Sequence, residues 1–114
     1  MEPFVVVITT LPDRASAHAL AEALVHERLA ACVNVMSECT SIYRWQGAVE
    51  TAAEVPLWIK TRAALFAAVA QFIKYHHPYD LPEVIALPVT AGLAPYLKWV
   101  EHETEQGQRN LEQP

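Results

Sequence analysis

Two stretches of sequence decide the fold of this chain: SIYRWQG at Ser41–Gly47 and EVPLWIKT at Glu54–Thr61. Both are rich in aromatic and β-branched residues, which favour strands, and Gly47 suits the turn between them. Pro56 has no amide hydrogen to donate, so it must lie at a sheet edge, a bulge or a strand start. The pattern predicts a long aromatic β-hairpin, whose exposed strand edges favour pairing with another chain.

The segments before the hairpin predict a strand, a helix and a second strand. Phe4–Thr10 is a β-branched run typical of a strand buried on both faces. Asp13 is a good helix N-cap, and apolar residues recur behind it at helical spacing from about Arg14 to Leu29. Ala31–Met36 alternates between two faces, as expected for a second strand.

The segments after the hairpin predict a helix, a strand and a final helix. Apolar side chains recur at helical spacing from Leu65 to His76, in a helix that Thr61 can cap and Pro78 must stop. Val84–Val89 is the last apolar strand. A short terminal helix follows, with apolar positions at Leu93, Tyr96, Leu97 and Val100.

This order of elements predicts an α+β fold, the ferredoxin-like βαββαβ sandwich, with a long β-hairpin and a C-terminal helix. Apolar residues stand at both parities of the strands, so the sheet face without helices must also be buried, as in an oligomer. We expect one domain over residues 1–103. From residue 104 to residue 114 the apolar spacing stops, which predicts a polar, frayed tail.

The composition supports self-association and excludes several classes of function. Apolar residues make up 53% of the 114 positions and charged residues 18%, against roughly 25% charged in an average domain. The net charge of −5 gives no electrostatic basis for binding nucleic acid. No apolar run approaches the roughly 20 residues of a membrane span, and Met1–Pro3 starts no secretory signal. We therefore expect a cytoplasmic protein that contacts neither nucleic acid nor membrane.

The densest group of chemically active residues is HHPYDLPE at His76–Glu83, a helix end and the loop behind it. Imidazoles suit copper, nickel and zinc. Neighbouring helical residues project about 100° apart, so His76 and His77 share one ion only if Pro78 distorts the last turn. A structural role competes with metal binding, because His76 continues the apolar stripe and His77 favours the helix dipole.

Several motifs, taken together in this order and spacing, resemble the CutA divalent-cation tolerance family over roughly residues 5–100. These motifs are Ala31–Asn34, Ser41–Gly47, Leu57–Thr61, His77–Tyr79 with Pro82–Glu83, and Tyr96–Trp99. The resemblance implies a ferredoxin-like subunit in a tight homotrimer, with the Ser41–Thr61 hairpins pairing between subunits. It also implies a cytoplasmic, non-enzymatic role in tolerance of copper and other divalent ions, with no catalytic residue and no required cofactor.

The same resemblance implies where a metal ion is held. Copper ligation in the family is associated with a first-strand Cys and with two His before a Pro-Tyr pair. The two His positions match His76 and His77, while the Cys position aligns with Thr9, a poorer ligand for a soft ion. The expected metal ligands are therefore His76, His77 and Glu83, for weakly bound Cu(II) or another divalent metal.

Two alternatives stay open at the level of sequence. One is a trimeric small-ligand sensor that resembles the nitrogen-regulatory signal proteins, which share this architecture and bind effectors in clefts between subunits. The other is an enzyme that depends on Cys32, whose test is the reactivity of its thiol. Cys32 and Cys39, seven positions apart, predict no disulfide.

Overall fold

The computed structural model describes residues 3–112, and the side chains as far as Glu105. The elements are β1 (Phe4–Leu11), α1 (Arg14–His26), β2 (Cys32–Val35), β3 (Cys39–Trp45), β4 (Ala48–Arg62), the 3-10 turn η1 (Ala63–Leu65), α2 (Phe66–His76), β5 (Ile85–Val89) and α3 (Ala94–Glu112). Among these helices, none combines the length and the apolar character that crossing a membrane requires.

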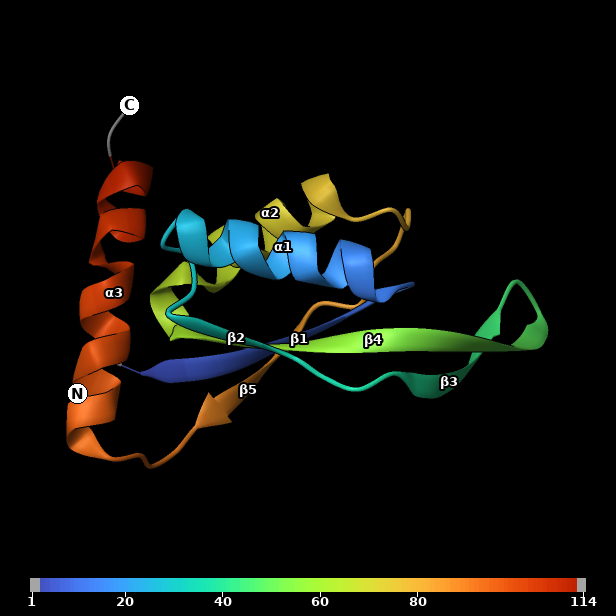
Figure 1. Ribbon diagram of the computed structural model, residues 1–114, viewed down its shortest axis with the longest axis horizontal. Coiled ribbons are helices and arrows are strands. Elements are labelled where there is room, and N and C mark those ends of the chain that lie inside the picture. Colours follow the sequence, from blue (N-terminus) through green and yellow to red (C-terminus); the bar gives the residue numbers. More distant parts are fainter. Residues whose placement is uncertain (1–2, 113–114) are drawn as a thin grey trace.

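The sheet has the strand order β2-β4-β1-β5, with antiparallel neighbours throughout, and β3 pairs with β4 away from this path. Helices α1 and α2 cover one face of the sheet, while α3 stands against one of its ends (Figure 1). This arrangement confirms the predicted ferredoxin-like sandwich with its long hairpin and C-terminal helix.

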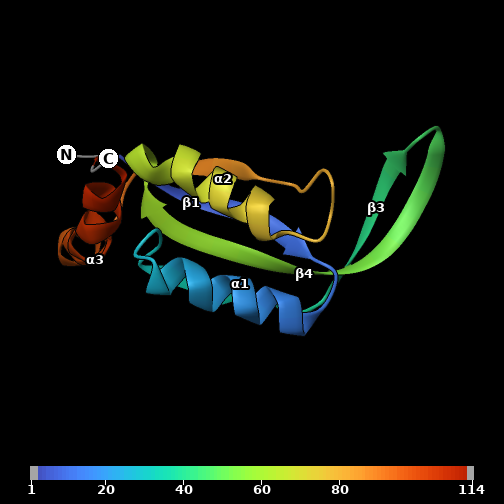
Figure 2. The ribbon, with the colours of Figure 1, turned by 90° about the horizontal axis from the view of Figure 1, so that it is seen from above.

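Strand β4 is 15 residues long and serves two partners along its length. Its first half pairs with β3, from Trp45 opposite Ala48 to Cys39 opposite Glu54, and its second half lies between β1 and β2. The hairpin turn consists of Gln46 and Gly47, whose φ angles of 50° and 83° suit a two-residue turn. Figure 2 shows this hairpin projecting well beyond the helical layer.

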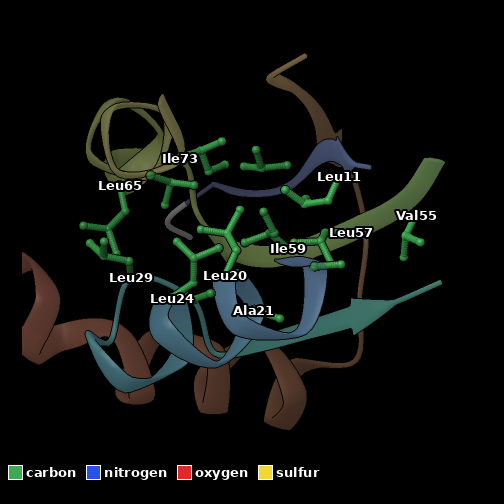
Figure 3. Packing of buried hydrophobic residues seen from close by; sticks show 14 residues of the cluster. Leu11, Leu20, Ala21, Leu24, Leu29, Val55, Leu57, Ile59, Leu65 and Ile73 are labelled. Atoms are coloured by element: carbon green, nitrogen blue, oxygen red, sulfur yellow. The ribbon is translucent and has the colours of Figure 1, made fainter. Parts of the chain in front are cut away.

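The core lies between the helices and the sheet (Figure 3). Apolar positions of α1 at helical spacing, such as Leu20 and Leu24, meet alternate positions of β4, such as Leu57 and Ile59. The buried cluster comprises Val7, Leu11, Ala17, Leu20, Ala21, Leu24, Leu29, Ala30, Val55, Leu57, Ile59, Leu65, Val69 and Ile73. Apolar residues at helical spacing and apolar residues at alternate strand positions therefore meet in one contiguous core.

The opposite face of the sheet is apolar and largely uncovered. Trp58 pairs across the ladder with Ile8, and Ile8 pairs with Ile85. Trp58, Ile85 and Leu87 are 40%, 50% and 46% exposed in the single chain. Helix α3 covers only the end of this sheet, in a small cluster of Phe4, Ala31, Leu97 and Val100. The structure therefore has a second apolar sheet face, as expected from the apolar residues on both sides of the predicted strands.

The predicted helix limits are right at some ends and wrong at others. Asp13 caps α1, since its side chain accepts a 2.7 Å hydrogen bond from the amide of Ser16. Helix α1 ends at His26 instead of near Leu29, because Arg28 adopts a left-handed φ of 58°. Helix α2 ends at His76, before Pro78, as expected.

Thr61 does not cap α2, contrary to the sequence prediction. The 3-10 turn η1 leads into α2, and neither start carries a side-chain cap. Thr61 is buried instead, and its hydroxyl donates a 2.7 Å hydrogen bond to the carbonyl oxygen of Leu29. The Thr61 side chain therefore bonds to a residue 32 positions away in the sequence instead of capping the helix that follows it.

The predicted start of a frayed tail at Thr104 is also wrong. Helix α3 continues to Glu112, and Thr104 is fully buried. The contact that holds this turn is polar: Arg62 donates from Nε to Oγ1 of Thr104 at 2.8 Å and from Nη2 to its carbonyl oxygen at 2.9 Å. The part of the predicted tail at residues 113–114 lies outside the described residues.

Candidate functional site

A cavity of about 880 Å³ lies between the β3–β4 hairpin and the loop that joins α2 to β5. Figure 1 shows this loop on the same side of the molecule as the hairpin. The cavity is lined by Thr10, Ser41, Ile42, Tyr43, Trp45, Glu54, Tyr79, Leu81, Pro82 and Glu83. Its lining therefore combines two carboxylates with aromatic and apolar side chains, and it holds no Lys, Arg or His.

Glu54 is a buried carboxylate, only 8% exposed, on β4. Its Oε2 atom accepts hydrogen bonds from the Tyr79 hydroxyl at 3.0 Å and from the Thr10 hydroxyl at 3.3 Å. Within the part of the chain whose side chains are described, no cationic group forms an ion pair with Glu54 or Glu83. Among the described residues, the partners of the Glu54 carboxyl are therefore two neutral hydroxyl groups.

Two groups beside Glu54 have raised pKa values. Partial burial raises the pKa of the Glu83 carboxyl, and the nearby Glu54 carboxylate raises it further. Burial and the hydrogen bond to Glu54 raise the pKa of Tyr79 to about 12. In both groups the surroundings therefore favour the protonated, neutral form.

His77 lies behind this cavity and has a structural role. Its Nε2 atom is 2.6 Å from the carbonyl oxygen of Thr10, and its Nδ1 atom is 3.1 Å from the amide nitrogen of Tyr79. A carbonyl only accepts and an amide only donates, so these partners assign the neutral tautomer with the proton on Nε2. Both ring nitrogens are thus occupied, and His77 positions the loop that carries Tyr79 against β1.

His76 is exposed and turns back onto its own helix. Its Nδ1 atom lies 2.9 Å from the carbonyl oxygen of Phe72, and its ring stacks on the Phe72 ring with a centroid separation of 4.1 Å. Thr9, which the resemblance aligns with a first-strand Cys, is fully buried, and its hydroxyl has no hydrogen-bond partner among the described residues.

The structure therefore does not assemble the ligand set expected from the sequence within one chain. Across the described residues, no three His, Cys, Asp or Glu side chains lie close enough to hold a metal ion. Of His76, His77 and Glu83, only Glu83 lines the cavity. The residue that sequence reasoning missed is Glu54. The sequence gives little indication of its role, because Glu54 is a single acid directly before the apolar run Val55–Ile59 and resembles an ordinary residue at a strand end.

The cysteines take no part in this cavity. Cys32 and Cys39 are both free, as the sequence predicts, and neither lines the cavity. Cys32 is half-buried on β2, and Cys39 is exposed at the start of β3. The strand geometry thus adds no support for an enzyme built on Cys32.

Comparison with known proteins places this architecture in one family. The family described as CutA1 divalent ion tolerance protein matches residues 5–103. Protein CutA of Homo sapiens is 48% identical over 96 residues, which are 84% of this chain and 54% of that protein. The divalent-cation tolerance protein CutA of Thermus thermophilus is 46% identical over 99 residues, which are 87% of this chain and 96% of that protein.

Solved structures agree with the sequence comparison. The crystal structure of CutA1 from Oryza sativa superposes with a TM-score of 0.89 at 43% identity, covering 92% of this chain and 96% of that one. The Cut A1 structure from Thermus thermophilus gives a TM-score of 0.87 at 44% identity, with 89% and 98% covered. The chain spans 54–59% of the length of several plant and mammalian relatives. Fold, motifs and matched length agree, and the chain belongs to the CutA1 divalent ion tolerance family.

Proposed function

We propose that this chain acts in divalent-cation tolerance, copper included, as a non-enzymatic cytoplasmic homotrimer that binds divalent metal weakly. The observation that carries the proposal is the pair of carboxylates, Glu54 and Glu83, which line one cavity without a cationic partner among the described side chains. Oxygen ligands of this kind bind divalent ions, and two of them supply fewer ligands than a tight site uses. The expected affinity is therefore low.

Metal titration by calorimetry tests this site. Cu(II) and Zn(II) are titrated into the wild type, Glu54→Gln, Glu83→Gln and the double variant His76→Ala with His77→Ala. We expect each Gln substitution to weaken binding, because it removes one of two charged ligands. Glu22→Gln on the exposed face of α1 removes the same charge elsewhere and serves as the control. Equal isotherms for the wild type and both Gln variants would remove the metal site from the cavity.

The histidine variants separate the two possible ligand sets. Because both His77 nitrogens have backbone partners, the proposal places the ion at the carboxylates and expects the double His variant, if folded, to retain most of the binding. A loss of binding in the His variant alone would contradict the carboxylate site and would show that His76 and His77 hold the ion.

The uncovered sheet face supports the homotrimer. Trp58, Ile85 and Leu87 expose apolar surface where the helices do not reach, and the hairpin presents further apolar side chains such as Ile42 and Val49. Burying these surfaces between copies is favourable. Light scattering gives the mass in solution, expected at three times the 12.7 kDa of one chain. Trp58→Glu is expected to lower this mass, whereas Val25→Glu on exposed α1 leaves it unchanged; a monomeric wild type would contradict the proposal.

The proposed cytoplasmic location is tested separately, by fractionation of cells that express the chain. Relatives carry names for other compartments: the Oryza sativa protein is called chloroplastic and the Archaeoglobus fulgidus structure periplasmic. Recovery of the chain in the soluble cytoplasmic fraction is the expected result, and recovery in another compartment would contradict it.

A further inference from the structure

Lys60 lies in the middle of the sheet face that the helices leave uncovered. It pairs across the ladder with Cys32 on β2 and with Val6 on β1, and Val6 pairs in turn with Leu87 on β5. Successive strand residues point to opposite faces, and the neighbouring Ile59 belongs to the core, so Lys60 points away from the helices. A cationic side chain therefore stands among apolar residues on this face.

Arg62, two positions further along β4, shows what a cation on this side of the strand needs. It is buried, and α3 supplies two oxygen acceptors from Thr104. Lys60 is half-buried, and its ammonium group has no hydrogen bond or ion pair among the described residues. Within the described chain, α3 thus satisfies the first of these two cations but not the second.

The surface around Lys60 becomes buried when copies assemble on this face. Trp58 and Leu87, close to Lys60 in the sheet, are 40% and 46% exposed in the single chain, and their burial favours assembly. Removing an ammonium group from water without a partner is strongly unfavourable, so buried charges are paired. Assembly on this face therefore requires a partner for Lys60 as well as an apolar cover.

A carboxylate of a second copy has the chemistry that this partner needs. The sheet face around Lys60 offers no acid of its own chain, because the positions beside it on β2, β1 and β5 are Cys32, Asn34, Val6, Ile8, Ile85 and Leu87. Each copy carries 13 acidic residues against 8 basic ones, so copies repel one another at long range. A pair between Lys60 and an acid of the next copy offsets this repulsion at the interface.

We infer that, in the assembled protein, the Lys60 ammonium group forms a buried ion pair with a carboxylate of a neighbouring copy. The inference rests on the proposed homotrimer and adds the group that Lys60 contacts in it. A copy docked in another register would leave both charges buried and unpaired, so the pair selects one arrangement of the copies, which apolar surface alone does not do.

The sign of one substitution tests this pair, because Lys60→Met removes the charge and keeps an unbranched side chain. When a neighbouring carboxylate pairs with Lys60, the variant leaves that carboxylate buried without a partner, and assembly weakens. When Lys60 has no partner, the variant removes an unpaired charge, and assembly strengthens. Light scattering at a fixed chain concentration reports the change as the urea midpoint at which the mass falls from three chains to one.

We expect a lower urea midpoint for Lys60→Met, equivalent to association at least about 10-fold weaker than in the wild type. Lys60→Arg keeps the charge and is expected to stay close to the wild type. Lys74→Met, at an exposed position of α2, is the matched control and is expected to leave the midpoint unchanged. An unchanged or higher midpoint for Lys60→Met would overturn the inference, and so would an equal loss in Lys60→Arg.

Acidification identifies the partner as a carboxylate. At pH 7 the assembled Lys60→Met variant contains an unpaired carboxylate, and this group becomes protonated as the pH falls toward 4. The midpoint of the variant is therefore expected to approach that of the wild type over this range. A difference that stays constant would assign Lys60 a neutral oxygen acceptor and would overturn the ion pair.

The same measurements separate this inference from the proposed homotrimer. A wild type with the 12.7 kDa mass of one chain would overturn both. A wild type of three chains, combined with a raised midpoint for Lys60→Met, would overturn the ion pair alone and leave the homotrimer in place.

Discussion

Arg62 at the end of β4 and Thr104 in α3 are joined by two hydrogen bonds across 42 positions of sequence, at 2.8 Å and 2.9 Å. Arg62 is 2% exposed, and the threonine hydroxyl also donates to the carbonyl oxygen of Val100 at 2.9 Å. The buried charge is thus held by polar groups of the helix. This contact fixes α3 against the end of the sheet.

Replacing Thr104 by Val tests the strength of this contact. The variant keeps the shape of the side chain but removes the acceptor of the Arg62 Nε–H, while the bond to the backbone carbonyl stays. We expect the free energy of unfolding to fall by about 1–3 kcal/mol, as for other hydrogen bonds to buried charged groups. Urea denaturation measures this change, and Thr90→Val, at an exposed position, is the matched control. Equal losses in the two variants would contradict a specific role for Thr104.

Two other buried threonines should respond in opposite directions to the same substitution. The Thr9 hydroxyl has no partner among the described residues, so Thr9→Val is expected to raise the free energy of unfolding by about 1 kcal/mol. The Thr61 hydroxyl donates to Leu29 at 2.7 Å, so Thr61→Val is expected to lower it by about 1–2 kcal/mol. Denaturation midpoints of the two variants decide between them, and a shift of the same sign in both would be the contrary outcome.

His77 and His76 provide a matched pair of histidines. Removing the buried ring of His77 leaves the Thr10 carbonyl and the Tyr79 amide without their partner, so His77→Ala is expected to destabilise the fold by about 2–4 kcal/mol. His76→Ala removes an exposed ring stacked on Phe72 and is expected to cost less than about 1 kcal/mol. Thermal unfolding in the presence of a chelator measures both. Similar losses for the two, or a dependence of either on added metal, would argue against the structural role of His77.

The raised pKa of Glu83 makes stability depend on pH with a definite sign. Because the folded state binds this proton more tightly than the unfolded state, the stabilising contribution is complete below the ordinary value of 4.5 and is lost as the pH rises through the folded pKa. Glu83→Gln cannot ionise, so its stability should gain on that of the wild type as the pH rises above 4.5, and the difference should then level off.

Urea midpoints recorded from pH 4 to pH 8 follow this difference between the variant and the wild type. Glu50→Gln, at an exposed position of the hairpin, is the control and should run parallel to the wild type throughout. Parallel curves for Glu83→Gln as well would show that Glu83 does not carry the pH dependence.

The features that the sequence predicts correctly are the local ones. The cap at Asp13, the end of α2 before Pro78 and the turn at Gly47 each depend on residues within a few positions. These signals were sufficient for the order of elements and hence for the fold.

The features that it missed depend on partners far away in the sequence. In the sequence Thr61 resembles a helix cap, but in the structure it bonds to the Leu29 carbonyl. Thr104 likewise resembles the start of a polar tail, but in the structure it accepts a hydrogen bond from Arg62. Glu54 becomes part of a cavity only because the loop at Tyr79 folds over the hairpin, 25 positions further along the chain. The role of each of these polar residues depends on a partner distant in the sequence, which a local pattern does not identify.

The length of β4 has a consequence for how the sequence can change. Its residues 57–60 are paired with β1 on one side and β2 on the other, so a single deletion there would invert the faces toward both neighbours at once. Leu57 and Ile59 would leave the core and Trp58 would enter it. Within one chain we therefore expect insertions and deletions to be tolerated best at the Gln46–Gly47 turn, which pairs with no third strand among the described residues, so that the hairpin changes its length from its tip.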